Sequence, residues 1–349
     1  MHTTPEGQIS LLDFKKEKIE LLNNVNLSND ELFIIKTANQ WMDEAKERPI
    51  PKKLFSILWF ESELCILFSD TNLGKSILAV QIADAISNGK SVLGFPSEVG
   101  PQKVMYFDFE LSDKQFETRY SYDYEDHYRF NNNFLRIEIN TDFCQDENLK
   151  DFENSFIDRF EKSIVKTKAK IVIVDNITYL KSENEKAKDA LSLMKQLKRL
   201  KKKYGLSILA LAHTPKRDLY KPISKNDLQG SKMLINFCDS SFTIGESQQD
   251  KQLRYLKQIK ARNTEIKYDS DNICLCQINK SYNFLQFEFA DYDIESKHLK
   301  IISAEDKSVL EDNIIELKES NPELSYGHIA NQLGTNKMKV KRVLDKNKS

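Results

Sequence analysis

One stretch in the first third of the chain places a short apolar strand, a polar loop and a helix directly after one another. It runs from Leu64 to Ser87 and reads LCILFSDTNLGKSILAVQIADAIS. The first six residues indicate a buried strand, and Gly89 is typical of a residue that ends a helix. This strand–loop–helix order is the local unit of an α/β fold.

The same alternation continues along the chain. Further apolar runs predict strands at 103–110, 134–139, 169–176 and 206–213, with helices at 147–166 and 186–205. The continuous β-branched run AKIVIVDN is typical of a strand buried on both faces. Short strands are predicted at 240–246, 253–262, 272–280 and 284–292. We therefore expect a mostly parallel sheet with helices on both faces and an antiparallel extension.

Three parts of the chain are expected. Residues 1–50 are predicted to be helical, because Ser28 and Glu31 form a capping-box pattern ahead of apolar residues at helical spacing. Those apolar residues are Leu32, Ile35, Ala38 and Trp41. The prolines of RPIPKK end that helix. Residues 51–298 form the α/β core, and residues 304–349 form a small helical domain.

Composition excludes several classes of protein. Of the 349 residues 40% are hydrophobic and 30% charged, and no apolar run approaches the roughly 20 residues of a membrane helix. The N-terminus lacks the layout of a signal peptide, so a cytoplasmic protein is expected. The five cysteines are scattered, and Cys274 and Cys276 suit one face of a strand better than a metal knuckle.

The opening loop matches a phosphate-binding pattern except at one position. Ser69 stands where G-x-x-x-x-G-K-[ST] has its first glycine. A working loop, a decayed loop and a chance match are all compatible with the stretch alone. In a working loop Lys75 reaches the terminal phosphates and Ser76 joins the Mg²⁺ shell. The predicted ATP-binding residues are Ser69, Asp70, Thr71, Asn72, Leu73, Gly74, Lys75 and Ser76.

Partners for such a loop follow at the ends of later strands. Asp175 ends the strand IVIVD about 100 residues downstream and is predicted to hold the metal through water. Asn176 occupies the next position, so the carboxylate that orients water either comes from elsewhere or is missing. Glu110 is our candidate, and Asp108 competes with it because the two face the same side. His213 ends the following strand and is placed to sense the γ-phosphate.

As a set, these motifs resemble the RecA/DnaB-like ATPases, and most of all the RepA-type hexameric helicases of plasmids. The resemblance covers about 49–289 and rests on LFSDTNLGKSILAVQIADAIS, VMYFDFELSDKQFETRY, IVIVDNITYL and ILALAHTPK. It implies a RecA-like P-loop core, ATP with Mg²⁺, and a ring, usually a hexamer, with ATP at each subunit boundary. The family's K-x-R pair matches Lys260 and Arg262, which would then reach the neighbouring subunit's ATP. Without the family they read as surface charges.

Two further segments are candidates for DNA contact. The resemblance implies a channel loop after His213, in which Lys216, Arg217 and Lys232 would meet phosphates, although solvated side chains fit as well. The tail fits a helix-turn-helix pattern, with Ser325 as a cap, Ala330 packed between helices, Gly334 at the turn and Val340 buried. Six basic residues and one aspartate give residues 336–349 a net charge of +5. The predicted contacts there are Lys337, Lys339, Lys341 and Arg342, unless the module binds protein instead.

These observations predict a ring-forming, ATP-dependent DNA helicase or translocase in plasmid or mobile-element replication. Two alternatives stay open. One is an ATPase that loads or regulates another protein without unwinding DNA. The other is a DNA-binding regulator whose ATPase core only switches conformation.

Overall fold

The structure is a computed structural model that describes residues 33–95, 97–140, 152–177, 188–215, 217–228, 231–300, 304–333, 335 and 337–347. Within these ranges the side chains of 152–155, 188–191, 231–233 and 304–307 are not described. The chain divides into two units, Met1–Ile50 and Pro51–Ser349, and each is described by itself.

The first unit contains the helix α2, Ala38–Lys46. Residues 33–37 are not helical, so the helix predicted to pass through Ile35 begins later than expected. The reason is a capping box at Thr37, whose side chain accepts a hydrogen bond from Gln40 N while the Gln40 side chain accepts one from Thr37 N. The predicted cap at Ser28 and Glu31 lies outside the described residues.

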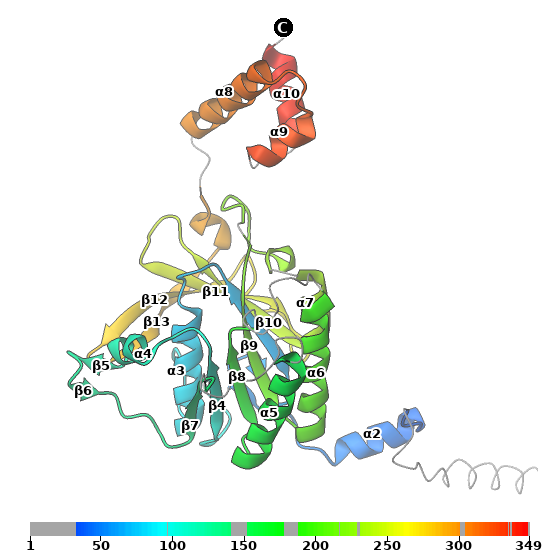
Figure 1. Cartoon of the computed structure of the whole chain (residues 1–349), viewed down its shortest axis with the longest axis vertical. Helices are drawn as coiled ribbons and strands as arrows, with labels where there is room; N and C mark the ends of the chain where they lie inside the picture. Colours follow the sequence, from blue (N-terminus) through cyan, green and yellow to red (C-terminus); the bar gives the residue numbers. More distant parts are fainter. Residues whose placement is uncertain are drawn as a thin grey trace, which may run out of the picture. The chain divides into compact units, whose positions relative to one another are not determined.

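A nine-stranded sheet forms the centre of the second unit (Figure 1). Its order is β13-β12-β11-β10-β3-β9-β8-β4-β7. Neighbours from β10 to β7 are parallel, whereas β10 to β13 pair antiparallel. The strands are β3 Leu64–Ser69, β4 Val104–Asp108, β7 Phe134–Ile137, β8 Ile171–Asp175, β9 Ser207–His213, β10 Ser240–Glu246, β11 Leu253–Lys260, β12 Ile273–Ser281 and β13 Phe284–Asp293. The mostly parallel sheet and its antiparallel extension are therefore confirmed.

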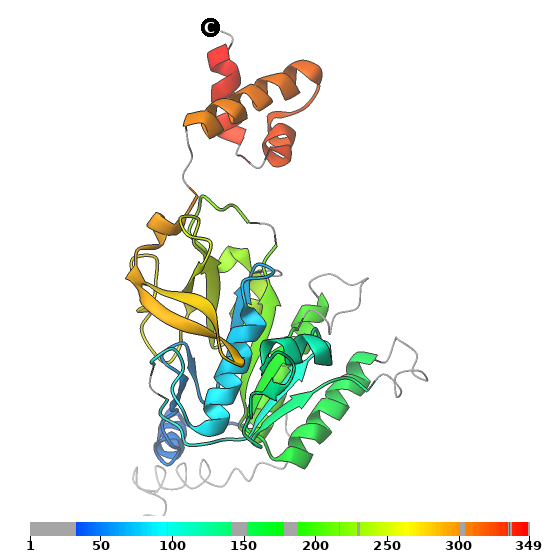
Figure 2. The same ribbon diagram turned by 90° about the vertical axis from the view of Figure 1, so that its left-hand side faces the viewer.

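Helices cover both faces of this sheet (Figures 1 and 2). One apolar cluster joins the sheet to α3, Lys75–Asn88, and another joins the opposite face to α5, Phe152–Thr167, and α6, Lys188–Tyr204. The remaining elements of the core are short: β1 Lys53–Phe55, β2 Trp59–Phe60, α4 Asp113–Arg119, β5 Ser121–Tyr122, β6 Asp126–His127, η3 Lys225–Asp227, α7 Ser231–Phe237 and η4 Glu295–His298. Burial on both faces explains why the central strands are continuously apolar.

The antiparallel hairpin β12–β13 crosses α3 (Figure 2). Gln81 of α3 donates to Phe287 O at 2.9 Å and accepts from Phe287 N at 2.9 Å. Cys274 and Cys276 are buried in β12, which confirms their predicted place on a strand. The extension therefore packs against the helix that follows the opening loop.

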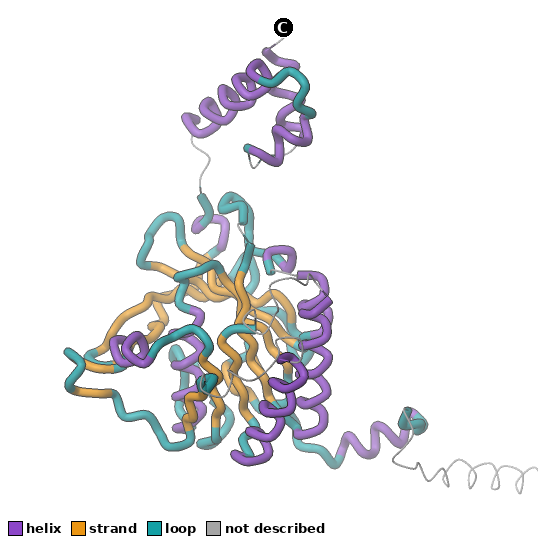
Figure 3. The backbone as a smooth tube through the Cα atoms, in the orientation of Figure 1, coloured by secondary structure: helices purple, strands orange, loops and turns teal. Residues whose placement is uncertain are grey.

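The last described residues form three helices (Figure 3): α8 Ala304–Ser320, α9 Tyr326–Gln332 and α10 Lys337–Asn347. Ser325 caps α9 by accepting a hydrogen bond from His328 N. Ala330 and Val340 are buried in the small core that the three helices share. The predicted packing positions are thus confirmed, while Gly334 lies outside the described residues.

Among the described residues, no helix combines the length and the apolar composition needed to cross a membrane.

Candidate nucleotide-binding site

Four adjacent strands bring the predicted site residues to one edge of the sheet. The strands lie in the order β3, β9, β8 and β4, and all run parallel. Ser69 at the end of β3 pairs in register with His213 at the end of β9, and Asp175 of β8 pairs with Asp108 of β4. Because parallel strands end at the same edge, groups up to about 140 residues apart in sequence meet there.

The loop before α3 adopts the backbone of an anion-binding turn. Asn72 and Gly74 both have left-handed φ, at 62° and 92°. The N-terminus of α3 has no side-chain cap, so its backbone N–H groups are open to an anionic ligand. The left-handed φ of Gly74 favours glycine, and a Cβ there would also lie 2.7 Å from Ile278 Cδ1 and 2.9 Å from Phe287 Cε2.

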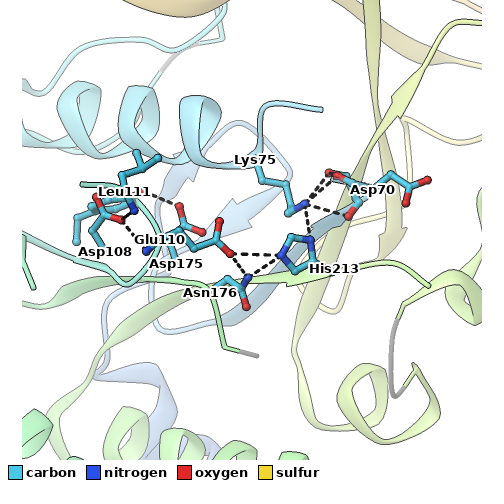
Figure 4. A network of polar contacts seen from close by, with 10 residues as sticks. Asp70, Lys75, Asp108, Glu110, Leu111, Asp175, Asn176 and His213 are labelled. Atoms are coloured by element: carbon cyan, nitrogen blue, oxygen red, sulfur yellow. Dashed lines mark hydrogen bonds and ion pairs between the residues drawn. The ribbon is translucent and has the colours of Figure 1, made fainter. Parts of the chain in front are cut away.

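Lys75 is folded back onto its own loop (Figure 4). Its Nζ donates to Ser69 O at 3.0 Å and to Asp70 O at 2.9 Å, and lies 3.2 Å from His213 Nδ1. Burial lowers the pKa of Lys75, and the nearby Asp175 and Glu110 oppose that effect. The ammonium group is held on neutral oxygens that phosphate oxygens could replace.

Ser69, the departure from the glycine pattern, fits this loop. It is 1% exposed, and its hydroxyl donates to Asp70 O at 2.9 Å. The same hydroxyl lies 3.3 Å from Lys75 Nζ. The serine therefore adds contacts to the folded loop without displacing the lysine.

Asp175 is a buried carboxylate with one unsatisfied oxygen. Tyr106 Oη donates to its Oδ2 at 2.6 Å, whereas its Oδ1 has no hydrogen-bond partner among the described residues. Burial raises the pKa of Asp175 to about 6, and the nearby hydroxyls of Ser76 and Tyr106 lower it in part. A buried carboxylate oxygen beside a serine hydroxyl is a donor set that fits the hydrated shell of Mg²⁺.

Glu110, Asn176 and His213 form a polar cluster beside Lys75 (Figure 4). Asn176 Nδ2 contacts Glu110 Oε1 and lies 2.7 Å from His213 Nε2, which is itself 3.3 Å from Glu110 Oε1. As an ammonium, Lys75 Nζ can only donate, so His213 Nδ1 accepts from it, while His213 Nε2 faces both Asn176 Nδ2 and Glu110 Oε1. The hydrogen bond from His213 lowers the pKa of Glu110, whereas burial opposes the shift.

Asp108, the competing carboxylate, is engaged differently. Its Oδ1 accepts hydrogen bonds from Glu110 N at 3.2 Å and Leu111 N at 3.0 Å, and its Oδ2 accepts one from Arg136 Nε at 2.9 Å. Both oxygens are therefore occupied, one by backbone N–H groups of the turn and the other by Arg136 of β7. Glu110 is the more accessible carboxylate at this edge, with 38% of its side chain exposed.

Lys260 and Arg262 do not join this group. Lys260 pairs in register with Ser241, near the start of β10, and so lies at the opposite edge of the sheet from the loop. Its Nζ donates to Cys238 O at 2.7 Å, and Arg262 Nη1 lies 3.1 Å from Asp239 Oδ1. Strand β3 alone separates the two edges by roughly 17 Å.

The predicted DNA contacts are only partly described. Lys216 lies outside the described residues, and Lys232 belongs to α7 without a described side chain. Arg217 Nη1 donates to Lys221 O at 3.2 Å. On α10, Lys337, Lys341 and Arg342 are exposed and Lys339 is partly buried, while Val340, Val343 and Leu344 face the helical core.

Sequence reasoning missed three contributors to the site. Arg136 lies in an ordinary-looking strand, and Tyr106 and Asn176 lie inside the segments VMYFDFELSDKQFETRY and IVIVDNITYL without a role assigned to them. The pairing of β7 with β4 places Arg136 beside Asp108, and no short sequence pattern encodes that pairing. Asn176 was noticeable only as the residue in the place of an expected glutamate.

Comparison with known protein families identifies the part of the chain that contains this edge of the sheet. A family model described as AAA domain matches residues 33–218. That range contains the loop Ser69–Ser76 and also Glu110, Asp175 and His213, but neither Lys260 nor Arg262. The comparison with curated proteins returned no match. Since the match covers more than half of the chain and includes the phosphate-binding loop, the chain belongs to the AAA domain family of P-loop ATPases.

Proposed function

We propose that the chain is an ATP-dependent DNA translocase or helicase of the RepA type that works as a ring, usually a hexamer. The observation that carries the proposal is the division of charged groups between two edges of one sheet. Lys75, Glu110, Asp175 and His213 gather at one edge, and Lys260 with Arg262 lies at the other. A cation at the far edge reaches an ATP only in a neighbouring subunit, so this division favours sites shared between subunits.

In this proposal the residues Ser69 to Ser76 bind the phosphates of ATP through backbone N–H groups and the Lys75 ammonium. Ser76 and Asp175 would hold Mg²⁺, which when bound neutralises phosphate charge. Binding requires Lys75 to exchange Ser69 O and Asp70 O for phosphate oxygens. That movement also takes the amine away from His213 Nδ1.

Glu110 then orients the attacking water. The water oxygen bonds to the γ-phosphorus while the bond from that phosphorus to the β–γ bridging oxygen breaks, giving ADP and phosphate. The depressed pKa of Glu110 keeps it ionised, so it accepts a hydrogen bond from the water. Lys260 and Arg262 of a neighbour stabilise the negative charge on the transferring group.

His213 connects this chemistry to DNA in the proposal. Its ring contacts both Lys75 and Asn176, and the chain continues directly into the loop that holds Arg217. His213 directly precedes that loop, so loss of its contact with Lys75 would shift the point from which the loop begins. We place Lys216, Arg217 and Lys232 on DNA in the channel, and Lys337, Lys339, Lys341 and Arg342 of a helix-turn-helix on duplex DNA.

A strand-separation assay on a forked duplex tests this function. With ATP and Mg²⁺ the chain is expected to release the labelled strand, and Lys75→Ala is expected to abolish both ATP turnover and release. ATP turnover without strand release would contradict the helicase and favour a loader. Absence of turnover together with DNA binding would favour a regulator whose core only switches conformation.

A further inference from the structure

The turn that carries Glu110 is closed by the side chain before it. Asp108 ends β4 with 3% of its surface exposed. Its Oδ1 accepts hydrogen bonds from the backbone N–H groups of Glu110 and Leu111, at 3.2 and 3.0 Å. An aspartate that binds the backbone two and three residues ahead fixes the path of the chain. The backbone position of Glu110 thus depends on the orientation of the Asp108 carboxylate.

One guanidinium group holds both sides of that turn. Arg136 Nε donates to Asp108 Oδ2 at 2.9 Å, and its Nη2 donates to Leu111 O at 2.8 Å. Its Nη1 also lies 2.8 Å from Asp113 at the start of α4. The planar fork of an arginine can satisfy these acceptors together, and a lysine cannot. The β7 strand therefore ties the carboxylate and a carbonyl of the turn to one rigid group.

We propose that Arg136 is a positioning residue for Glu110, a role that rests on the proposed function of Glu110 as the group that orients water. Arg136 does not contact the water or ATP. It holds Asp108 and Leu111, and these fix the backbone from which the Glu110 carboxylate extends toward Asn176 and His213 (Figure 4). Displacements of about 1 Å at such a group can reduce a rate by roughly 100-fold.

Arg136→Gln tests this role through the separation of kcat from KM. We expect kcat for ATP hydrolysis to fall about tenfold, with KM for ATP changed by less than about twofold, because the phosphate loop lies on other strands. Arg136→Lys keeps the charge without the fork, and its kcat should lie between those of Arg136→Gln and the parent chain. Asp113→Asn removes the charge of one of the two exposed carboxylates that Arg136 contacts, the other being Glu138, and should change kcat less than about twofold. Equal losses in all three variants would overturn the proposal.

A second variant separates positioning from folding. Arg136→Gln leaves the buried Asp108 charge unpaired, which can destabilise the chain by itself. The double variant Asp108→Asn/Arg136→Gln removes that charge and retains a side-chain oxygen for the turn. We expect its melting temperature to recover while kcat stays low, because Leu111 O still lacks its guanidinium donor. Recovery of kcat together with stability would mean that Arg136 only supports the fold.

A double-mutant cycle with Glu110 completes the test. If Arg136 acts through Glu110, Arg136→Gln should lower kcat by less than about twofold in a Glu110→Gln background. A full tenfold loss in that background would overturn the positioning role. If the parent chain hydrolyses no ATP, or if Glu110→Gln alone leaves turnover unchanged, the proposed function itself fails and this inference fails with it.

Discussion

The two edges of the large sheet each hold a lysine on backbone carbonyl oxygens, but the surroundings of the two amines differ. Lys75 lies on Ser69 O and Asp70 O, and Lys260 lies on Ile235 O and Cys238 O. Burial lowers the pKa of both amines. At the loop edge nearby carboxylates oppose this shift, whereas at the far edge Cys238 and Asp239 oppose it and Arg262 adds to it.

The difference lies in the balance of charge at each edge. Lys75 lies near Asp70, Glu110 and Asp175 of its own chain. At the far edge one carboxylate, Asp239, pairs with both Lys201 and Arg262, at 2.7 and 3.1 Å. Half of the Arg262 side chain remains exposed. At the loop edge Lys75 thus lies among several carboxylates, whereas at the far edge a half-exposed arginine shares one carboxylate with Lys201.

The largest expected effect tests whether the two edges cooperate between subunits. Arg262→Ala should lower ATP turnover at least about 100-fold, because an arginine supplied by a neighbour stabilises transition-state charge. Glu110→Gln should have a similar effect, since water loses its acceptor. Mixing the two variants should restore roughly a quarter of the parent turnover, since about one boundary in four then has both groups.

Matched mixtures provide the control for that experiment. In a mixture of Arg262→Ala and Lys260→Ala every boundary lacks one of the two cations, because a single subunit supplies both. Turnover of this mixture should therefore stay at the average of the two separate variants. Turnover of the Glu110→Gln and Arg262→Ala mixture that equals the average of the separate variants, measured under conditions where subunits exchange, would contradict action across a boundary.

The next effect concerns pH at the loop edge. The raised pKa of Asp175, about 6, means that the folded chain without ligand binds its proton more tightly than the unfolded chain. The contribution of this group to the free energy of unfolding is therefore largest below about pH 4 and is lost as pH rises through about 6. Mg²⁺ needs the ionised carboxylate, so the affinity for Mg²⁺–nucleotide should fall about tenfold from pH 7 to pH 5.

Asp175→Asn is the matched variant for this prediction. It should weaken binding of Mg²⁺–nucleotide at pH 7 and remove most of the change between pH 5 and pH 7. Titration with a fluorescent ATP analogue at both pH values measures the effect. An undiminished pH dependence in Asp175→Asn would assign the titration to another group.

A smaller effect is expected from the carboxylate at the far edge. Asp239→Asn keeps a side-chain oxygen near Leu64 N but removes the charge that holds Arg262. Turnover should fall about fivefold as Arg262 loses its ion pair. Asp218→Asn breaks a surface pair with Lys221 and is the control, with turnover close to that of the parent chain. Equal turnover in the two variants would argue that the ion pair with Asp239 does not position Arg262 for catalysis.

The smallest effect concerns Ser69. Ser69→Gly removes a hydroxyl that contacts Asp70 O and Lys75 Nζ, while the carbonyl that holds the lysine remains. ATP turnover should stay within about threefold of the parent value, because a lost neutral hydrogen bond changes stability by only about 1 kcal/mol. A large gain in turnover would show instead that the serine restrains Lys75.

Sequence patterns predicted the elements of the core well. The strand ending at Asp175, the strand ending at His213 and the helix Lys75–Asn88 appear where their apolar runs predicted them. The apolar pattern predicted these elements correctly because they are buried, and buried elements consist mainly of apolar residues. It failed at the N-terminus, where local capping by Thr37 and Gln40 starts α2 later than the apolar spacing indicated.

The choice between Glu110 and Asp108 illustrates what a local pattern does not contain. In the predicted strand 103–110 the two residues alternate to the same side, so their spacing does not distinguish them. Only the neighbouring strand distinguishes them, because β7 brings Arg136 against Asp108 and leaves Glu110 to Asn176 and His213. Pairing between distant strands is a tertiary property, since it depends on which strands become neighbours.

The sequence alone determined the chemistry that this chain carries: a phosphate-binding loop, a buried strand ending in aspartate, and a basic C-terminal helix. Those features are local, because hydrophobic period and turn residues act over a few positions. The tertiary structure determined which of these residues lie together and at which edge of the sheet. The order β3-β9-β8-β4 gathers residues from four strands at one edge, and the antiparallel return of β11 sends Lys260 and Arg262 to the other. Strand order and direction arise from packing of the whole sheet, which no segment specifies by itself.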